Sequence, residues 1–359
     1  MSLESGSVSF MPYSLESENF YTDNNLAVLI SENAFPADIN KVGRERISGF
    51  NTLKGDAAEE SGVIFEEQIW LDSSDGEIAV FTFDAAQRKP PAETLRAEIN
   101  AEFRRYMHDT NTTYLRRETR KEIVAEVTKN MTLDSVPTLT RTGICIIPHR
   151  KLAFICTTSQ HTADEIVRHL GMLLRIKLTP ITAASLMKDH GVDPYDLTPS
   201  AFCGLPAETL FLLTELEDFL TWLYYHPYHT CDLIAGCFPP FTFKNLDSTV
   251  KCGEEGAAAI LKHIYRAGLK LIAAPIAMDS GGDAISSLTF DAAKFLFKAA
   301  PPKQDTISLT RPEGLTGRIS NICEMWDSFN TLLKAFLEVR ADQAQWSAAV
   351  DEINKYIGE

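Results

Sequence analysis

Two apolar stripes with a helical repeat, separated by a short polar break, constrain the fold of this chain more than any other feature. Apolar side chains recur every three or four residues over 95–107 and again over 123–131. The break between them, Asp109–Thr113, has the polar residues typical of a turn. Because an apolar stripe at the 3.6-residue period indicates one face of a helix, we expect a helical hairpin at about residues 91–131.

Strand patterns precede this hairpin. Val63–Leu71 and Ile78–Phe83 are rich in β-branched and aromatic residues, and Leu26–Ile30 is a shorter run of the same kind. The cluster Asp72–Gly76 between the first two runs is typical of a turn. The sequence therefore predicts three strands here, two of them joined in a β-hairpin.

A second β-hairpin and a capped helix follow the helical hairpin. Ile144–Ile147 and Leu152–Thr157 predict two strands, joined by a turn at Pro148–Lys151. Thr162 and Glu165 have the spacing of a capping box, which predicts that a helix begins there.

The second half of the chain has fewer regular patterns. Leu210–Tyr225 predicts a helix, whereas His226–Lys251 is aromatic and proline-rich and is interpreted as irregular. Leu269–Met278 and Ile285–Phe290 flank a glycine-rich turn and predict a hairpin. Amphipathic helices are expected over residues 319–357.

These patterns together predict an α+β fold. The length of 359 residues is enough for about two domains. The loop-like stretch Gly191–Gly204 is the expected boundary. We expect a strand-rich central domain over residues 1–190, with its helical-hairpin tip at about 91–131. A second, α+β base domain over 205–359 ends in the C-terminal helices.

The composition bears on the cellular location of the protein. No apolar run approaches the ~20 residues that span a bilayer, and residues 1–25 lack the pattern of a secretion signal. The seven cysteines have irregular spacing, which does not indicate a disulfide framework. We therefore expect a cytoplasmic protein with no membrane partner.

The net charge of −15, from 34 basic and 49 acidic side chains, hides an uneven distribution. Residues 1–90 hold 16 acidic and 6 basic side chains, whereas residues 104–121 and 141–190 each carry a net charge of +4. Two interpretations are open for this basic middle section. Its long side chains either solvate a helix face or create a local field that attracts phosphate.

No motif establishes catalysis or cofactor binding. The densest set of potential metal ligands is His226, His229, Cys231 and Cys237. Their spacing fits no standard zinc site, so buried cysteines and stacked histidines are the more common explanation. Ser185–Lys188 matches the S-x-x-K pattern of some serine hydrolases, but the companion motifs are missing. Glycine-rich nucleotide-binding patterns are missing too, so we expect no enzyme and no cofactor.

The order of several segments resembles the RdgC family, the recombination-associated proteins of bacteria. The resemblance covers most of the chain. Each motif is weak alone, and the resemblance rests on the common order of the motifs along the chain. The matching segments are Thr119-Arg-Lys-Glu122, Met131-Thr-Leu133, Ile144–Thr157, Ser159 with Ala163-Asp164-Glu165, Leu220-Thr-Trp-Leu223, His263-Ile264, Ala267-Gly268-Leu-Lys270 and the helix from Ile319.

The resemblance implies a strand-rich centre, a helical tip and a separate base. It also implies a ring-shaped homodimer that encircles duplex DNA without reading its sequence, in the nucleoid, and restrains RecA-type recombinases. A basic lining inside an acidic exterior reconciles DNA binding with the negative net charge. The residues expected to line the ring are Arg104, Arg105, Arg116, Arg117, Arg120 and Lys121, with Arg141 and Lys151 as weaker candidates.

The chain also departs from the pattern of this family. Asp134 and Val136 stand where the family has a basic and an aromatic residue, and Glu254-Glu255 replace part of a basic stretch. These departures bear on ring closure and DNA affinity. Two alternatives therefore stay open. One is a metal-dependent nuclease or hydrolase that uses the histidine and cysteine set, and the other is a protein-interaction scaffold that has lost DNA binding.

A ring of two subunits closes through two separate contacts. We expect one contact on the helical hairpin near Tyr106–Arg117 and the other in the C-terminal half. Phe219, Trp222 and Tyr225 are candidates for the second contact, because aromatic side chains supply large buried areas at interfaces. The alternative for these three residues is the core of the monomer.

Overall fold

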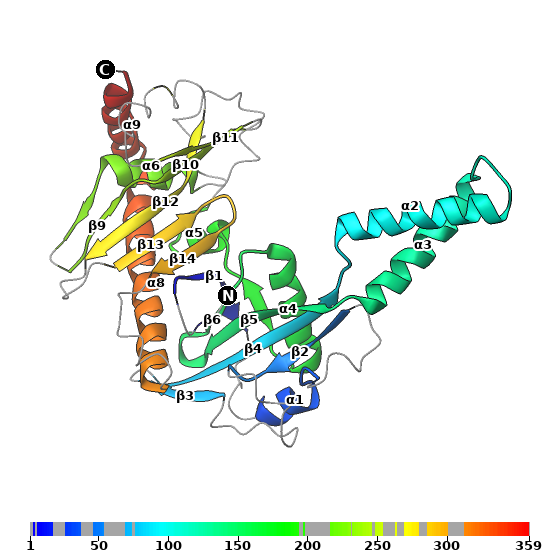
Figure 1. Cartoon of the computed structure of the whole chain (residues 1–359). Helices are drawn as coiled ribbons and strands as arrows, with labels where there is room; N and C mark the ends of the chain where they lie inside the picture. Colours follow the sequence, from blue (N-terminus) through cyan, green and yellow to red (C-terminus); the bar gives the residue numbers. More distant parts are fainter. Residues whose placement is uncertain are drawn as a thin grey trace.

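The structure is a computed structural model that describes residue 3, residues 6–16, 26–36, 46–53, 69–73, 76–193, 197, 216–230, 232–245, 248–253, 263, 269–279, 286–300 and 312–358. Figure 1 shows three parts: a central lobe, a C-terminal lobe, and a two-helix arm that projects away from both. The fold is α+β, as predicted.

The central lobe and the C-terminal lobe are each built on antiparallel strands. Those of the central lobe are β1 (Val8–Leu15), β2 (Arg46–Asn51), β3 (Trp70–Ser73), β4 (Gly76–Arg88), β5 (Pro137–Ile147), β6 (Leu152–Ile155) and β7 (Leu178–Pro180). Those of the C-terminal lobe are β8 (Tyr228–His229), β9 (Ile234–Cys237), β10 (Phe241–Lys244), β11 (Thr249–Cys252), β12 (Lys270–Asp279), β13 (Ser286–Asp291) and β14 (Leu296–Ala300).

Hydrogen bonds join the two sets of strands into one continuous sheet. The order is β11-β10-β12-β13-β14-β1-β6-β5-β4-β2, with β3, β7, β8 and β9 paired beside this path. The junction is β1, whose residues Val8–Phe10 pair with β14, while the following residues Met11–Ser14 pair with β6. The two lobes therefore share a strand.

Helices cover the sheet and form the arm. They are α1 (Leu26–Glu32), α2 (Ala92–Asp109), α3 (Arg117–Asp134), α4 (Gln160–Leu173), α5 (Ala183–Asp189), α6 (Glu217–Tyr225), α8 (Pro312–Ala341) and α9 (Gln343–Gly358), with a 3-10 turn η4 (Pro148–Arg150). The arm consists of α2, α3 and the turn between them.

Both faces of the central strands are buried. Along β1, Val8 and Phe10 belong to one core cluster, and Met11, Tyr13 and Leu15 belong to another. The first cluster lies under α8 and also contains residues of α6 and α9, whereas the second contains residues of α1 and α4. Alternate residues of a strand point to opposite faces, so a strand between two helical layers is apolar throughout.

Helix α8 packs across the junction between the lobes. The Trp326 ring lies 5.3 Å from that of Phe297 on β14 and 6.3 Å from that of Phe154 on β6, measured between centroids. Phe10 on β1 lies between these strands, with its ring 4.7 Å from that of Phe154 and 5.6 Å from that of Phe297. One aromatic cluster thus joins the shared strand, both lobes and the long helix.

Several sequence predictions are confirmed. The hairpin around Asp72–Gly76 is formed by β3 and β4, and that around Pro148–Lys151 by β5 and β6. Strands β12 and β13 pair as expected, whereas the glycine-rich segment between them lies outside the described residues. The C-terminal helices are α8 and α9, and the predicted helical hairpin is the arm.

Leu26–Ile30 is a helix, so the strand prediction is wrong there. Leu26, Ala27 and Ile30 are buried, which places them on one face of α1. A short apolar run fits either structure, and here the hydroxyl of Ser31 donates to the carbonyl of Ala27 at 2.8 Å within the helix.

Two further predictions need correction. His226–Lys251 is not irregular, because four short strands, β8 to β11, occupy it, and the prolines Pro239-Pro240 lie in the turn between β9 and β10. Helix α4 begins three residues earlier than expected: Ser159 is its N-cap and accepts the Thr162 N–H at 3.3 Å.

The expected domain boundary at Gly191–Gly204 lies mostly outside the described residues, which include only 191–193 and 197 in that stretch. None of the described helices is long and apolar enough to cross a membrane.

Replacing Phe10 with alanine tests the junction. We expect the free energy of unfolding to fall by about 3–5 kcal/mol, because the cavity opens where both lobes and α8 meet. Phe10→Leu, which keeps most of the volume, is the matched control and should cost less than about 2 kcal/mol. Urea titration followed by far-UV circular dichroism measures both. Equal losses for the two variants would contradict the packing role.

Candidate nucleic-acid interface

The arm grows directly out of two paired strands. β4 and β5 pair from Ala79 opposite Ile146 to Arg88 opposite Pro137, and the arm begins where this ladder ends. Helix α2 follows β4, and helix α3 leads back into β5. The longest strand pair of the sheet therefore supports the projection.

Arg88 attaches the arm to the sheet. Its side chain is 9% exposed, and its Nη1 donates to the carbonyl of Ser135 at 2.7 Å and to that of Leu133 at 3.2 Å. These carbonyls lie at the C-terminal end of α3, where backbone acceptors lack helical partners and a cation is favourable. The guanidinium thus caps α3 at the root of the arm.

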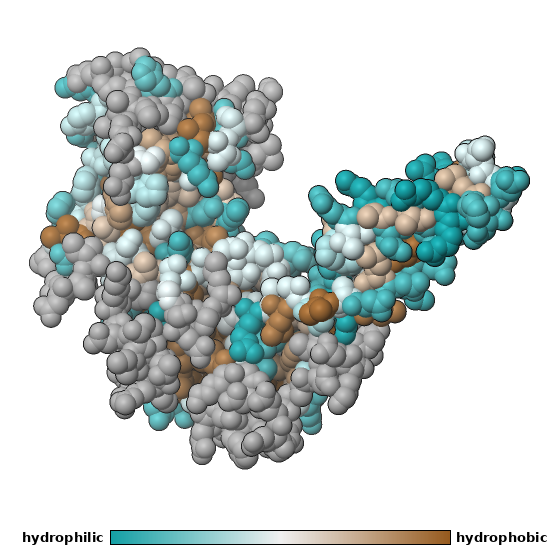
Figure 2. Space-filling model, viewed as in Figure 1, coloured by the Kyte–Doolittle hydropathy of each residue, from teal (hydrophilic) through white to brown (hydrophobic). Residues whose placement is uncertain are grey.

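The arm is held together by a narrow apolar seam. Helix α2 has no buried residue, and its seam residues Leu95, Ile99 and Phe103 are only half-buried. On α3, Ile123 and Val127 are buried. Figure 2 shows hydrophilic residues over most of the arm, with apolar residues along part of the face in view.

Three of the predicted cations at the tip have partners within the arm. Arg104 donates from Nε to the carbonyl of Asn100 at 3.3 Å, and Arg105 pairs with Glu102 at 2.7 Å. The guanidinium of Arg120 lies 5.2 Å from the ring centroid of Phe103, a cation–π contact that links α3 to α2.

The other three tip cations are exposed: Arg116, Arg117 and Lys121. No described residue forms a hydrogen bond or ion pair with their side chains. Arg116 is the N-cap of α3 and supplies no side-chain cap, so the first backbone N–H groups of the helix have no partner there. A helix N-terminus beside exposed guanidinium groups is suited to bind phosphate oxygens.

Charge changes sign along the arm. Residues 104–121, at the tip, carry six basic and two acidic side chains, a net charge of +4. The remaining residues, 92–103 and 122–134, carry two basic and six acidic side chains, a net charge of −4. The field of the arm is therefore positive only at its far end.

Arg141 has a different environment from the tip. It lies on β5 and binds the buried carboxylate of Asp84, with Nη2 at 3.0 Å from Oδ2 and Nε at 3.1 Å from Oδ1. Asp84 also accepts a hydrogen bond from Asn51 at 3.1 Å. The Arg141 guanidinium neutralises a buried charge inside the sheet, which leaves it less available to DNA.

Lys151 lies at the end of β5 opposite the arm. It occupies a left-handed backbone conformation after η4, with a φ of 50°, and its side chain is exposed. The structure thus brings six of the eight predicted cations together at the tip and places Arg141 and Lys151 elsewhere.

The potential metal ligands do not converge in the part of the chain that the structure describes. His226 stacks on Trp222 and lies 3.2 Å from Glu352, and His229 is exposed on β8. Cys237 is buried in the core, where desolvation raises the pKa of its thiol. Cys231 lies outside the described residues, and no three described histidine, cysteine or acidic residues form a cluster suited to a metal ion.

Ser185 has a structural role at the start of α5. Its hydroxyl accepts the Thr182 N–H at 2.9 Å, and the Thr182 hydroxyl accepts the Ser185 N–H at 3.2 Å. This reciprocal cap accounts for the serine of the S-x-x-K match.

The aromatic candidates for the second dimer contact belong mainly to the monomer core. Phe219 is fully buried, with its ring 5.5 Å from that of Phe336, and Trp222 is 7% exposed. Tyr225 is half-buried and stacks on Tyr356, which is 52% exposed. Phe219 and Trp222 are therefore buried in the monomer, and the exposed aromatic side chain beside them is Tyr356.

Two arm features were not predicted from the sequence. Arg88 contacts carbonyls more than forty residues away, so no local pattern indicates its capping role. Tyr114, at the tip, is 71% exposed. An exposed aromatic beside arginines is detectable in the sequence only once the turn of the hairpin has been located.

No protein-family model matches the chain, and no curated protein matches it.

Arg141→Met should lower the free energy of unfolding by about 2–4 kcal/mol, because it leaves the buried Asp84 carboxylate without its cation. Lys121→Met, at an exposed position on the arm, is the control and should change stability by less than about 0.5 kcal/mol. Urea unfolding of both variants gives the comparison. A neutral Arg141→Met would show that the pair does not stabilise the sheet.

Proposed function

We propose that this protein binds duplex DNA without sequence preference and resembles the RdgC family in doing so. The proposal includes a ring-shaped homodimer that encircles DNA in the nucleoid and limits access of a RecA-type recombinase. The observation that carries it is the arm, which projects exposed arginines away from a chain whose net charge is −15.

The tip is suited to phosphate rather than to base edges. Arg116, Arg117 and Lys121 are exposed, and they lie at the start of α3, where unpaired N–H groups add to the positive field. Phosphate contacts of this kind position a protein on DNA but carry no sequence information. A protein that covers duplex in this way competes with any filament that needs the same DNA.

The shape supports a half-ring. Figure 2 shows an open space between the C-terminal lobe and the arm. Two copies related by a two-fold axis can enclose this space through two isologous contacts.

Exposed aromatic residues supply candidate anchors for the two contacts. Tyr114 at the tip is 71% exposed, and Tyr356 on α9 is 52% exposed. Phe219 and Trp222, which the sequence predicts as anchors, are instead buried in the core of the monomer.

A protein-interaction scaffold is the second candidate function. Val136, between α3 and β5, is 85% exposed, and Leu139 on β5 is 46% exposed. A partner protein that covers the root of the arm would bury these apolar side chains. Failure to bind DNA, together with dimer formation, would favour this candidate.

Changing Arg116 and Arg117 together to glutamine should weaken duplex binding and reduce its salt dependence. Each lost phosphate contact lowers the slope of log K against log salt by about 0.9, so we expect a slope lower by about 2. The matched control removes two cations from the root of the same arm, Arg96→Gln with Lys129→Gln. Fluorescence anisotropy of a labelled duplex at several salt concentrations gives both slopes.

The control should retain the slope of the unmodified protein. Equal effects of the tip and root variants would show that general electrostatics, and not the tip, attracts DNA. Absence of duplex binding at low salt, about 50 mM, would overturn the proposal itself.

The ring predicts a specific pattern of oligomeric states. At about 10 µM the unmodified protein should be a dimer in light scattering. Tyr114→Ser and Tyr356→Ser should each open one contact and leave an expanded dimer, whereas the double variant should be a monomer. A monomeric unmodified protein contradicts the ring.

A further inference from the structure

Two short links join the arm to the sheet, and both involve prolines. Residues 89–91 connect β4 to α2 and include two prolines, whereas residues 135 and 136 connect α3 to Pro137, the first residue of β5. Proline fixes its own φ at about −65° and restricts the residue before it to extended conformations. Pro91 has a φ of −56° and a ψ of 132°, and Ser135 has a φ of −77° and a ψ of 145°, so the chain is extended on both sides. The links therefore restrict the directions in which the arm can point.

Arg88 spans the two links. It is the last residue of β4, and its backbone pairs with Pro137 at the start of β5. Its guanidinium Nη1 donates to the carbonyl of Ser135 at 2.7 Å. Ser135 belongs to the end of α3, because its hydroxyl and its N–H both donate to the carbonyl of Thr132, at 2.8 and 3.3 Å. The Arg88 side chain therefore connects the strand that leads into α2 with the end of α3.

This contact is suited to hold the arm in one direction. Hydrogen bonds from a charged donor are stronger than those between neutral groups, and water has little access to a side chain that is 9% exposed. A second bond, from the same Nη1 to the carbonyl of Leu133 at 3.2 Å, fixes the guanidinium at two points of the chain. Among the described elements, α2 and α3 pack extensively only against each other, and Figure 1 shows the arm projecting away from both lobes. The direction of the arm therefore depends strongly on Arg88.

Arg88 does not itself present a charge to DNA. Its side chain is buried at the root of the arm, where two backbone carbonyls accept from Nη1. The exposed cations Arg116, Arg117 and Lys121 lie at the other end of α3. Any effect of Arg88 on DNA binding is thus transmitted through the direction of the arm.

We propose that Arg88 is a positioning residue for the DNA-binding tip. By fixing the arm in one direction, it brings the tip cations to the duplex without the loss of orientational freedom that a mobile arm would undergo on binding. This inference rests on the proposed DNA-binding function. The affinity for duplex DNA should depend on Arg88, whereas the number of phosphate contacts should not.

Arg88→Gln tests the proposal through the salt dependence of duplex binding. We expect binding about tenfold weaker at each salt concentration, since the arm must then be ordered when DNA binds. The slope of log K against log salt should stay unchanged, because the same cations contact the same phosphates. Arg88→Lys keeps the charge but not the planar fork of donors, and its affinity should lie between those of Arg88→Gln and the unmodified protein. Fluorescence anisotropy of a labelled duplex gives the affinities and the slopes.

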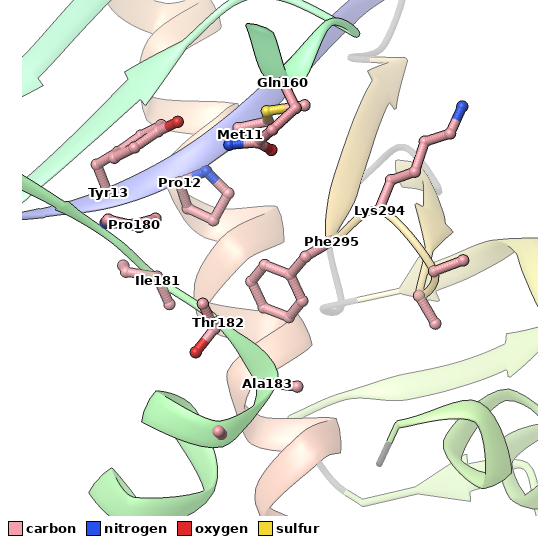
Figure 3. Close-up of a pocket in the computed structure, with 13 residues that line it drawn as sticks. Met11, Pro12, Tyr13, Gln160, Pro180, Ile181, Thr182, Ala183, Lys294 and Phe295 are labelled. Atoms are coloured by element: carbon pink, nitrogen blue, oxygen red, sulfur yellow. The ribbon is translucent and has the colours of Figure 1, made fainter. Parts of the chain in front are cut away.

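Phe295→Leu is the control for a general loss of stability. The Phe295 side chain lines a cavity where β1, β7 and residues 292–295 meet (Figure 3), and its ring lies 5.8 and 5.3 Å from those of Phe290 and Phe297, measured between centroids. The change weakens packing in the sheet and leaves the arm and its root unaltered. It should therefore lower the melting temperature but not the affinity for duplex. Equal losses of affinity in Phe295→Leu and Arg88→Gln would contradict the positioning role.

Hydrogen exchange of the free protein measures the root of the arm without DNA. Arg88→Gln should increase the exchange of backbone amides over residues 132–138, because the end of α3 then lacks its anchor. Phe295→Leu should leave the exchange of this segment unchanged. Unchanged exchange in Arg88→Gln overturns the inference. A slope lower by about 0.9, the value of one phosphate contact, also overturns it, because Arg88 would then contact DNA directly.

Two outcomes separate this inference from the proposed function. If the unmodified protein binds no duplex, the proposed function fails, and the inference fails with it. If Arg88→Gln binds duplex as tightly as the unmodified protein, the inference alone is overturned.

Discussion

The shared strand β1 is the constraint on which the rest of the molecule depends. Three of its residues pair with β14 and the next four pair with β6, so one short segment completes both lobes. Its two faces lie in two separate cores, under α8 on one side and beside α1 and α4 on the other. Loss of β1 would remove a central strand from each lobe and part of each core. The stabilities of the two lobes are therefore coupled.

Burial divides the basic side chains into two groups with different uses. Arg88 and Arg141 bind carbonyls and a carboxylate at the root of the arm, and Arg318 donates to the carbonyl of Gly6 inside the fold. Arg340 stacks on Trp346 at 4.4 Å. Positive charge counted along the sequence therefore overstates the positive charge that is exposed at the surface.

Sequence patterns that extend over a few neighbouring residues predict the helices and strands well. Contacts between residues far apart in the sequence are not predictable from such patterns. The arm was predicted because both its stripes repeat at the helical period. Leu26–Ile30 was assigned wrongly, because five apolar residues are too few to separate a strand from a helix. The buried position of Phe219 and the pairing of Arg141 with Asp84 depend on partners 57 or more residues away, which no local pattern reveals. The cluster of six tip cations was predictable because all six lie within one hairpin.

Because the arm is attached at its root, a small rotation there produces a large displacement of its tip. Each of its helices has 18 residues, which corresponds to a length of about 27 Å. Among the described residues, the arm is attached at its root, where two strands and the Arg88 cap fix its direction. At the helix length of ~27 Å, a rotation of about 10° at the root displaces the tip by about 5 Å. The width of the gap between arm and lobe is therefore set by a few atoms around Arg88, far from any residue at the tip.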